Sequence, residues 1–305
     1  FLYFIGESTM GIVLPKPITT KVVERMGNGH VNSAAVSVNG FRNSMEDAHV
    51  LYSGPDRMVF GVFDGHSNDR CSAFIAQHIA KRIQALPLPL SNESLEKMCL
   101  ELDEEFLEEH GDGGTTGTFA IVIPTGSDYD VVVCNVGDSR TILIKNNALA
   151  FVTDDHKPAN PGERARIEKA GGLVRMNRVD GDLAVSRAFG DGFFKKNRDD
   201  ARNQKVIAVP DITRMKASKG DTFIIACDGV FEGNFSTEEV VTFAVQQMPP
   251  PSNDYAVTAS RIIDQAIRRG SKDNISCLVV NMGDGTEAVA LHGTNSFVPG
   301  PPYPR

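Results

Sequence analysis

The sequence predicts an α+β fold in which two antiparallel β-sheets pack face to face and helices cover the outside. Roughly ten strand-like segments and about four or five helical segments are grouped along the chain rather than alternating one by one. Turn residues follow several strand segments closely, which favours antiparallel pairing over β-α-β units. Apolar strands in this number are buried most simply between two packed sheets.

The strand segments are apolar, β-branched-rich runs bounded by turn residues. Residues 34–38 lead into Asn39-Gly40, which predicts a tight hairpin turn, and a second strand is expected over residues 41–51. The other strand segments, in chain order, are residues 58–63, 119–123, 131–136, 141–144, 222–227 and 275–280.

The helical segments show apolar residues three and four positions apart, together with capping signals. Residues 71–83 and 95–106 each present one apolar face. The remaining helices are expected from Asn160-Pro161 to Gly171-Gly172, after the capping box of Ser236 and Glu239, and over residues 254–269 up to Gly270.

Composition places the chain among ordinary globular proteins and excludes several classes. Its 305 residues carry 31 Lys and Arg against 39 Asp and Glu, a net charge of −8, so a binder of nucleic acid or anionic membrane is not expected. No apolar run approaches the roughly 18 residues that a membrane span needs. The five cysteines are odd in number and scattered, which argues against a disulfide framework and predicts a reducing compartment.

Aspartates recur at the ends of apolar strand segments. Asp64 follows residues 58–63, Asp228 follows residues 222–227, Asp138 comes after residues 131–136, and Asp273 precedes residues 275–280. A carboxylate beside a core is costly unless it is paired, protonated or bound to a metal. Oxygen ligands without histidine favour Mg²⁺ or Mn²⁺ over Zn²⁺, and several converging aspartates suit a pair of such cations.

The predicted strand over residues 41–51 carries three further polar candidates. Arg42 and Glu46 are four residues apart, so they share one face of an extended segment. Asp47 would point the other way unless a bulge intervenes. Glu46 is therefore the better site candidate of the two carboxylates.

Eight short motifs occur in order along most of the chain. They are RNSMEDAH (42–49), VFDGH (62–66), GTT (114–116), VGDSR (136–140), DHKP (155–158), LAVSRAFGD (183–191), ACDG (226–229) and SKDN (271–274). In this wording and order the chain resembles the metal-dependent protein phosphatases of the 2C type. The resemblance implies a central β-sandwich of two antiparallel sheets flanked by helices, four layers in all. It also implies an enzyme that hydrolyses phosphoserine and phosphothreonine in proteins, by attack of a water that bridges two Mn²⁺ or Mg²⁺ ions.

The resemblance also implies a role for each matching residue. The metal ligands would be Asp64, Gly65 through its carbonyl, Asp228 and Asp273, with Glu46 acting through water and Asp47 just outside the direct ligands. Arg42 would bind the substrate phosphate, and His66 would be the general acid. A third, weaker cation position would use Asp138 and the residue four after Asp228, which here is Glu232, one methylene longer than the family's aspartate.

The domain organisation follows from these motifs. We expect residues 30–283 to be the catalytic domain, with an N-terminal extension over residues 10–29 and an extended tail over residues 284–305. Residues 1–9 are expected to be a remnant of cloning before a native start at Met10, where Gly11 is a weak candidate for myristoylation because Pro15 replaces the favoured Ser or Thr. We expect a monomer that acts on phosphoproteins in the cytoplasm, with the nucleus, or the membrane surface if Gly11 is acylated, as alternatives.

Several other interpretations stay open. Cys134 and Arg140 have the C-x₅-R spacing of cysteine-dependent phosphatases, although Cys134 lies in an apolar run where its thiol would be inert. A scaffold that binds phosphorylated partners without turnover is one alternative function, and a metal-dependent phosphodiesterase or nuclease is another. The basic stretch over residues 195–205 is either a solvated loop or, with residues 158–178, part of a surface that selects phosphoprotein substrates.

Overall fold

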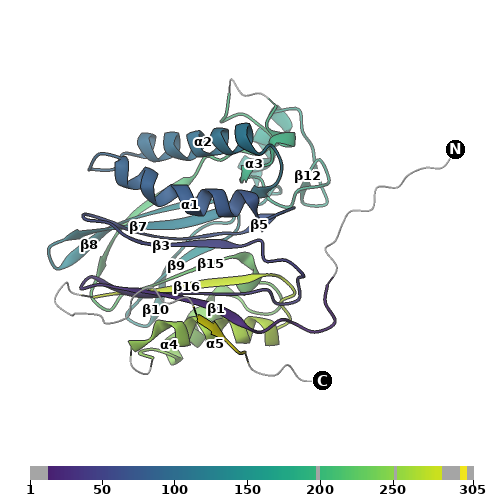
Figure 1. Cartoon of the computed structure of the whole chain (residues 1–305). Helices are drawn as coiled ribbons and strands as arrows, with labels where there is room; N and C mark the ends of the chain where they lie inside the picture. Colours follow the sequence, from purple (N-terminus) through teal and green to yellow (C-terminus); the bar gives the residue numbers. More distant parts are fainter. Residues whose placement is uncertain (1–12, 197–199, 251–252, 284–295, 301–305) are drawn as a thin grey trace.

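Two antiparallel sheets lie face to face at the centre of the protein (Figure 1). The computed structural model describes residues 13–196, 200–250, 253–283 and 296–300. The five-stranded sheet has the order β14-β8-β7-β4-β3 and the seven-stranded sheet the order β10-β9-β15-β16-β2-β1-β17. Both are antiparallel throughout, so the predicted α+β sandwich is confirmed.

The strands of the five-stranded sheet are β3 (Ala48–Ser53), β4 (Met58–Phe63), β7 (Gly117–Thr125), β8 (Asp128–Val136) and β14 (Asp211–Ser218). Those of the seven-stranded sheet are β1 (Lys21–Gly27), β2 (Val31–Val38), β9 (Arg140–Lys145), β10 (Ala148–Val152), β15 (Thr222–Ala226), β16 (Ile275–Met282) and β17 (Ser296–Val298). Three short strands, β5 (Gly65–His66), β6 (Gly114–Thr115) and β13 (Phe189–Gly190), form a small sheet at the edge. A separate hairpin joins β11 (Val174–Arg175) to β12 (Arg178–Val179).

Helices cover the outer face of each sheet (Figure 1). The helices α1 (Arg70–Ala85) and α2 (Asn92–Glu109) lie over the five-stranded sheet, and α4 (Thr237–Gln246) and α5 (Tyr255–Arg268) lie under the seven-stranded one. α3 (Pro161–Lys169) and the 3₁₀ turns η1 (Gly192–Phe194) and η2 (Asp228–Val230) lie in the connections. Every predicted helix is present, including the capping box that Ser236 and Glu239 form at the start of α4.

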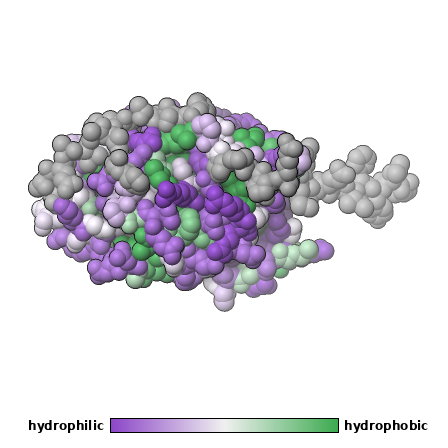
Figure 2. Space-filling view, turned by 90° about the horizontal axis from the view of Figure 1, so that it is seen from below, coloured by the Kyte–Doolittle hydropathy of each residue, from purple (hydrophilic) through white to green (hydrophobic). Residues whose placement is uncertain are grey.

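Among the described residues, the two large sheets and the four helices that cover them enclose three successive cores, and a smaller fourth cluster includes Ile167 of α3. One lies between the two sheets and includes Phe60 and Phe223, both buried. The other two successive cores lie between each sheet and its helices, around Phe106 on the α1–α2 side and Ile263 on the α4–α5 side. Figure 2 looks onto the α4–α5 face, where hydrophilic side chains gather between smaller hydrophobic areas. Among the described helices, none combines the length and the apolar character that crossing a membrane requires.

The predicted hairpin at Asn39-Gly40 is wrong. β2 pairs with β1 and β16 in one sheet, whereas β3 pairs with β4 in the other, so residues 39–47 cross between the sheets as an irregular loop. Gly40 has a φ of +60°, and a Cβ there would lie 2.3 Å from the backbone oxygen of Asp273. The glycine therefore allows a left-handed turn and a close approach to the backbone of Asp273. A hairpin does not form here, because both edges of β2 are already paired, with β1 and with β16.

The domain boundaries also differ from expectation. Residues 21–27 form β1, which pairs with β2 inside the seven-stranded sheet, so the folded unit starts before residue 30. Residues 296–298 of the expected tail form β17 and pair with β1. The expected cloning remnant over residues 1–9, the Met10-Gly11 pair and most of the tail lie outside the described residues.

The basic stretch after α3 differs from the expected solvated loop at its first residue. The Nζ atom of Lys195 is buried and forms an ion pair with Asp103 of α2 at 2.7 Å, and it also donates to the Ala188 oxygen at 2.7 Å. Its neighbour Lys196 is exposed, with Nζ over the Phe193 ring. Lys195 therefore fixes this segment to α2 and is not available to select substrates, because its charge is already paired inside the protein.

Replacing Lys195 with methionine is expected to lower the free energy of unfolding by about 3 kcal/mol, because Asp103 would be left buried without its counter-charge. Urea denaturation followed by circular dichroism measures this change. The matched control is Lys196→Met, which removes the adjacent but exposed ammonium and should leave the stability unchanged. Equal effects of the two substitutions would show that the buried ion pair does not stabilise the fold.

Candidate metal centre and active site

Strand register brings the predicted aspartates to one end of the sandwich. Ala48 of β3 pairs with Phe63 of β4, so the residues just outside this pair, Asp47 and Asp64, lie next to each other. In the other sheet, Ala226 of β15 pairs with Cys277 of β16, which places the end of β15 beside the start of β16. Asp228 and Asp273 are thereby adjacent, and the stacking of the two sheets brings both pairs together.

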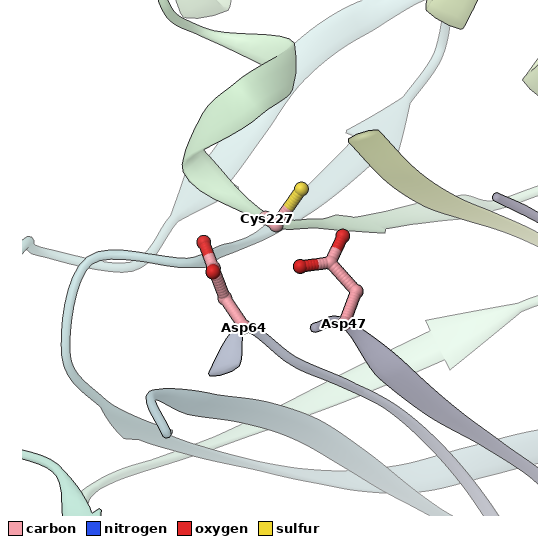
Figure 3. Close-up of side chains that lie close together, drawn as sticks. All are labelled: Asp47, Asp64 and Cys227. Atoms are coloured by element: carbon pink, nitrogen blue, oxygen red, sulfur yellow. The ribbon is translucent and has the colours of Figure 1, made fainter. Parts of the chain in front are cut away.

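The first acidic group consists of Asp47, Asp64 and the thiol of Cys227, whose ligand atoms all lie within 4.8 Å of one another (Figure 3). Both carboxylate oxygens of Asp47 are buried and make no hydrogen bond among the described residues. Burial raises the pKa of Asp47 to about 6, against a smaller opposing effect of the nearby Ser276 and Cys227 side chains. An ionised carboxylate in this position calls for a cation.

The second acidic group consists of Asp228, Glu232 and Asp273, whose carboxylate oxygens also lie within 4.8 Å of one another. Burial raises the pKa of Asp228 well above its usual value, and the charges of Asp138, Glu232 and Asp273 raise it further. The pKa of Asp64 is raised in the same way, by burial and by the neighbouring carboxylates. Like charges in a partly desolvated site repel one another, and bound cations would remove that repulsion.

The donor atoms of both groups suit a hard divalent cation. All of them are carboxylate oxygens except the thiol of Cys227, which is buried and accepts a hydrogen bond from the Ser276 backbone N–H at 3.1 Å. Burial raises the pKa of Cys227 well above its usual value, so the thiol stays protonated. Neutral sulfur is a poor ligand beside several carboxylates, and the set therefore fits Mg²⁺ or Mn²⁺.

The loop over residues 41–47 places Asp47, not Glu46, in the acidic groups. The Glu46 carboxylate accepts a hydrogen bond from the Ser44 hydroxyl at 2.9 Å, and its backbone N–H donates to the side-chain oxygen of Asn274 at 2.9 Å. The preference for Glu46 assumed a strand with a period of two. Because these residues form a loop, that premise is wrong, and the Asp47 side chain lies beside Asp64 and Cys227.

Arg42 lies at the mouth of the cluster. Its Nη2 atom donates to Asp273 at 2.7 Å, and about two fifths of the side chain is exposed, 39%. Its Nε atom is buried without a hydrogen bond among the described residues. The guanidinium is therefore held beside the acidic groups, and the exposed part of the side chain leaves it open to an incoming anion.

His66 and Asp191 meet across the small edge sheet. β5 pairs His66 with Gly114 of β6, and β13 pairs Gly190 with the same Gly114 from the other side. A Cβ on Gly114 would lie 2.3 Å from an Asp191 oxygen and 2.4 Å from His66 Nε2, so only glycine allows the two side chains to meet. Their contact, His66 Nε2 to Asp191 Oδ2, is 2.7 Å long.

Asp191 changes the acidity of His66. Burial alone would lower the pKa of His66, but the charge and hydrogen bond of Asp191 outweigh it and raise the pKa above the usual value. Sequence pattern alone does not predict that His66 and Asp191 pair. Asp191 is the last residue of the LAVSRAFGD motif, so the motif already contained the partner of His66. The two residues are 125 positions apart, and no local pattern connects them.

The two residues expected at a third cation position have different neighbours in the structure. Glu232 belongs to the group with Asp228 and Asp273, whereas Asp138 belongs to neither acidic group found among the described residues. Asp138 is buried and forms an ion pair with Lys157 instead.

The alternative based on Cys134 is wrong. Cys134 lies within β8 and is fully buried, and burial raises the pKa of its thiol to about 12. The Arg140 guanidinium, which would have to bind phosphate, is bound to the Asp155 carboxylate at 2.7 and 2.8 Å. A buried neutral thiol cannot act as the nucleophile that the C-x₅-R spacing suggested.

Comparison with known proteins gives a consistent result. The family model described as Protein phosphatase 2C matches residues 31–275. The chain is 32% identical to Protein phosphatase 2C homolog 2 of Schizosaccharomyces pombe, over 89% of this chain and 78% of that protein. It is 33% identical to Protein phosphatase 1B of Homo sapiens, over 89% of this chain and 61% of that protein. Among solved structures, a phosphatase from Toxoplasma gondii superposes with a TM-score of 0.83 and 31% identity, covering 91% of this chain and 99% of that one.

Proposed function

Because the chain belongs to the protein phosphatase 2C family of metal-dependent serine/threonine phosphatases, we propose that it hydrolyses phosphoserine and phosphothreonine in proteins at the acidic end of its sandwich. The observation that supports this most is the convergence of carboxylates from both sheets, with Arg42 and His66 beside them. Oxygen ligands for divalent cations, a phosphate-binding guanidinium and a proton donor are the parts that phosphomonoester hydrolysis requires.

The carboxylates would hold two Mn²⁺ or Mg²⁺ ions. We assign Asp64, Asp228 and Asp273 as direct ligands, with the carbonyl of Gly65 as a further one, and Glu46 and Asp47 as residues that act through water or hydrogen bonds. When bound, such ions supply positive charge beside the phosphate oxygens and lower the pKa of a coordinated water towards neutrality. Support for these assignments comes from the buried, unpaired oxygens of Asp47 and from the crowding that raises the pKa of Asp64 and Asp228.

Arg42 would bind and orient the substrate phosphate. Its planar fork of N–H donors matches two phosphate oxygens at once, which a lysine could not do. The ion pair with Asp273 holds the guanidinium at the rim, so little side-chain freedom is lost when phosphate binds.

His66 would donate a proton to the leaving oxygen of serine or threonine. Charge grows on that oxygen as its bond to phosphorus breaks, and a protonated imidazole can neutralise it. Asp191 would be a positioning residue, because it accepts the hydrogen bond of His66 Nε2 and stabilises the charged ring. The other ring nitrogen, Nδ1, would then be the atom that faces the substrate.

Asp191→Asn is expected to lower kcat for a phosphothreonine peptide about tenfold while changing kcat for p-nitrophenyl phosphate by less than about twofold. The alkoxide of threonine needs protonation, whereas p-nitrophenolate is a stable leaving group. Steady-state kinetics on both substrates measures the difference, and Asp182→Asn, which alters an exposed aspartate of the same segment, is the control. An equal loss on both substrates would show that Asp191 supports the loop and not the proton transfer.

The test of the proposed function is an assay of p-nitrophenyl phosphate and a phosphothreonine peptide with Mn²⁺ or Mg²⁺. EDTA and a thiol alkylator are added in parallel. Hydrolysis that requires the metal, is lost in EDTA and survives alkylation would support the assignment. Metal binding seen by calorimetry without any turnover would overturn it in favour of a scaffold that recognises phosphorylated partners.

A further inference from the structure

We propose that a cavity between α2 and residues 200–204 binds a small organic cation with an apolar body, and that the bound cation acts on the segment that carries Asp191. None of the residues that line this cavity belongs to the two acidic groups, so its ligand can be sought without metal or turnover. Only the effect of that ligand on catalysis rests on the proposed function.

The cavity has the size of a site for a small organic molecule. Among the described residues, α2 and residues 200–204 contribute most of its lining, and its volume is about 520 Å³. Ligand sites for small molecules typically have volumes of about 300 to 1,000 Å³. Leu100 and Leu107 of α2 provide apolar wall, and Ala201 adds a third apolar side chain. The cavity can therefore hold the apolar body of such a ligand.

The lining of the cavity is acidic. Counted over the described residues, five carboxylates and three cationic side chains line it. Each of the three cations already has a carboxylate partner: Lys195 pairs with Asp103, Lys97 with Glu101, and Arg202 with Glu96. Glu93 and Glu104 are exposed on α2 and form no ion pair in the described part of the chain. The remaining negative charge favours a cationic ligand.

Gln204 leaves an acceptor unsatisfied at the same cavity. The residue lines the cavity and is only 6% exposed, yet its Oε1 atom is buried without a hydrogen-bond partner among the described residues. A buried acceptor without a partner is unfavourable, and an ammonium group of a ligand would satisfy it. This oxygen is an observation independent of the acidic side chains, and both call for a cationic donor.

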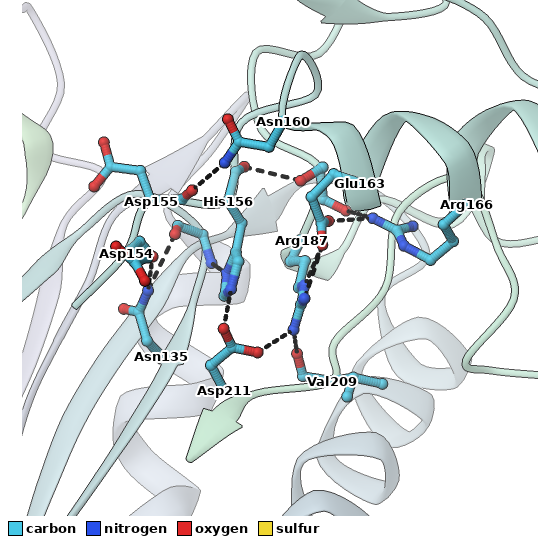
Figure 4. A network of polar contacts seen from close by, with 12 residues as sticks. Asn135, Asp154, Asp155, His156, Asn160, Glu163, Arg166, Arg187, Val209 and Asp211 are labelled. Atoms are coloured by element: carbon cyan, nitrogen blue, oxygen red, sulfur yellow. Dashed lines mark hydrogen bonds and ion pairs between the residues drawn. The ribbon is translucent and has the colours of Figure 1, made fainter. Parts of the chain in front are cut away.

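The backbone around Gln204 is fixed by α3 (Figure 4). Arg166 of α3 donates from Nη1 to the Gln204 oxygen at 2.6 Å and to the Lys205 oxygen at 3.0 Å. Its Nη2 atom binds Glu163, which also accepts from Arg187 at 2.7 Å. This side of the cavity is therefore preformed, so little freedom is lost when a ligand binds.

The α2 side of the cavity holds the two residues that flank Asp191. The Oδ1 atom of Asp103 accepts a hydrogen bond from the Gly190 backbone N–H at 2.6 Å. Leu107 packs against Gly192, where a Cβ would lie 3.0 Å from Leu107 Cδ2. Asp103 and Leu107 both line the cavity, so a ligand there contacts the side chains that support this segment.

Asp191 depends on that support. Its backbone is left-handed, with a φ of +55°, a conformation that costs free energy in an aspartate and persists only when neighbouring contacts enforce it. Its side chain binds His66 at 2.7 Å. A ligand that moves the two α2 side chains therefore alters the position of the residue that orients His66.

NMR titration of the ¹⁵N-labelled full chain with tryptamine tests the site in metal-free buffer. Indoleacetate is the matched anion, because it has the same ring system and the same number of carbon atoms. We expect tryptamine to bind with a Kd of about 1 mM and to shift the Gly190 amide and His66 ring signals. Indoleacetate should bind about tenfold more weakly, and Gln204→Leu should weaken tryptamine about fivefold.

Glu104→Lys and Glu108→Lys are the matched pair of charge variants. Both residues are exposed on α2, and both substitutions change the net charge equally, but only Glu104 lines the cavity. Glu104→Lys should weaken tryptamine about tenfold and Glu108→Lys less than about twofold.

Three results would each overturn the proposal: equal binding of tryptamine and indoleacetate, equal effects of the two lysine variants, or Gly190 and His66 signals that do not move at saturation. Failure of the proposed phosphatase function would instead appear in the metal-dependent assay and would leave these shifts unchanged.

Discussion

Asp228→Asn is expected to reduce kcat about a thousandfold or more and yet to leave the metal-free protein at least as stable as wild type. The amide has nearly the size of the carboxylate but no charge, so it binds a divalent cation poorly. Loss of several kcal/mol of charge stabilisation in the transition state corresponds to this fall in rate.

The stability of the metal-free variant follows from the sign of the pKa shift. Burial and the neighbouring carboxylates raise the pKa of Asp228 in the folded state. A carboxyl group whose folded pKa lies above its unfolded pKa destabilises the fold when it ionises, and the penalty grows as the pH rises above the unfolded value. Removing the charge at pH 7 should therefore raise the melting temperature of the metal-free protein by a few degrees.

Two measurements separate this result from simple damage to the fold. Scanning calorimetry in EDTA gives the metal-free melting temperature, and the same scan with Mn²⁺ shows a stabilisation that the variant should largely lose. Asp130→Asn, which removes an aspartate paired with Lys216, is the control and should keep both activity and Mn²⁺ stabilisation. If Asp228→Asn unfolded in EDTA while wild type did not, Asp228 would be a structural residue and not a ligand.

His66→Gln is expected to lower kcat for a phosphothreonine peptide about a hundredfold but for p-nitrophenyl phosphate less than tenfold. Glutamine can still form a hydrogen bond with Asp191, so the small edge sheet should persist. It cannot donate a proton to an alkoxide, and general acids contribute about 10²- to 10⁴-fold to such steps. The ratio of the two kcat values is the measurement, because a change in folded fraction cancels from it.

His78→Gln is the matched control for this variant. His78 lies on α1, where its Nδ1 atom contacts the Phe74 oxygen at 2.8 Å, and the expected change in the kcat ratio is nil. A similar loss of both activities in His66→Gln would assign His66 to phosphate binding or to support of the site. A loss confined to the alkyl phosphate would identify it as the proton donor.

Local pattern was sufficient for most of the fold and for the acidic residues of the site. Apolar runs predicted the strands, capping residues predicted the helices, and an aspartate at the end of an apolar run predicted Asp64, Asp228 and Asp273. These signals are local because a strand buried on both faces must be apolar along its whole length. The end of such a run is also where a charged residue can first be placed without being buried in the core.

Predictions failed where the outcome depended on a partner distant in sequence. Asn39-Gly40 has the sequence of a hairpin turn, but β1 and β16 occupy both edges of β2 and force a crossing between sheets. That crossing also brings the Asp47 side chain beside Asp64, which a strand with a period of two did not predict. Lys195 begins a stretch with the composition of a solvated loop, yet its side chain is buried and paired with Asp103 of α2.

Local sequence patterns are therefore enough to predict the α+β class, most strands and helices, and the carboxylates at the strand ends. Which charges pair with each other depends on the packing of the folded chain: His66 pairs with Asp191, Arg42 with Asp273, and Asp138 with Lys157. The physical reason is that periodicity and capping act over a few residues, whereas the free energy of a buried charge depends on whichever partner the packed sheets bring to it.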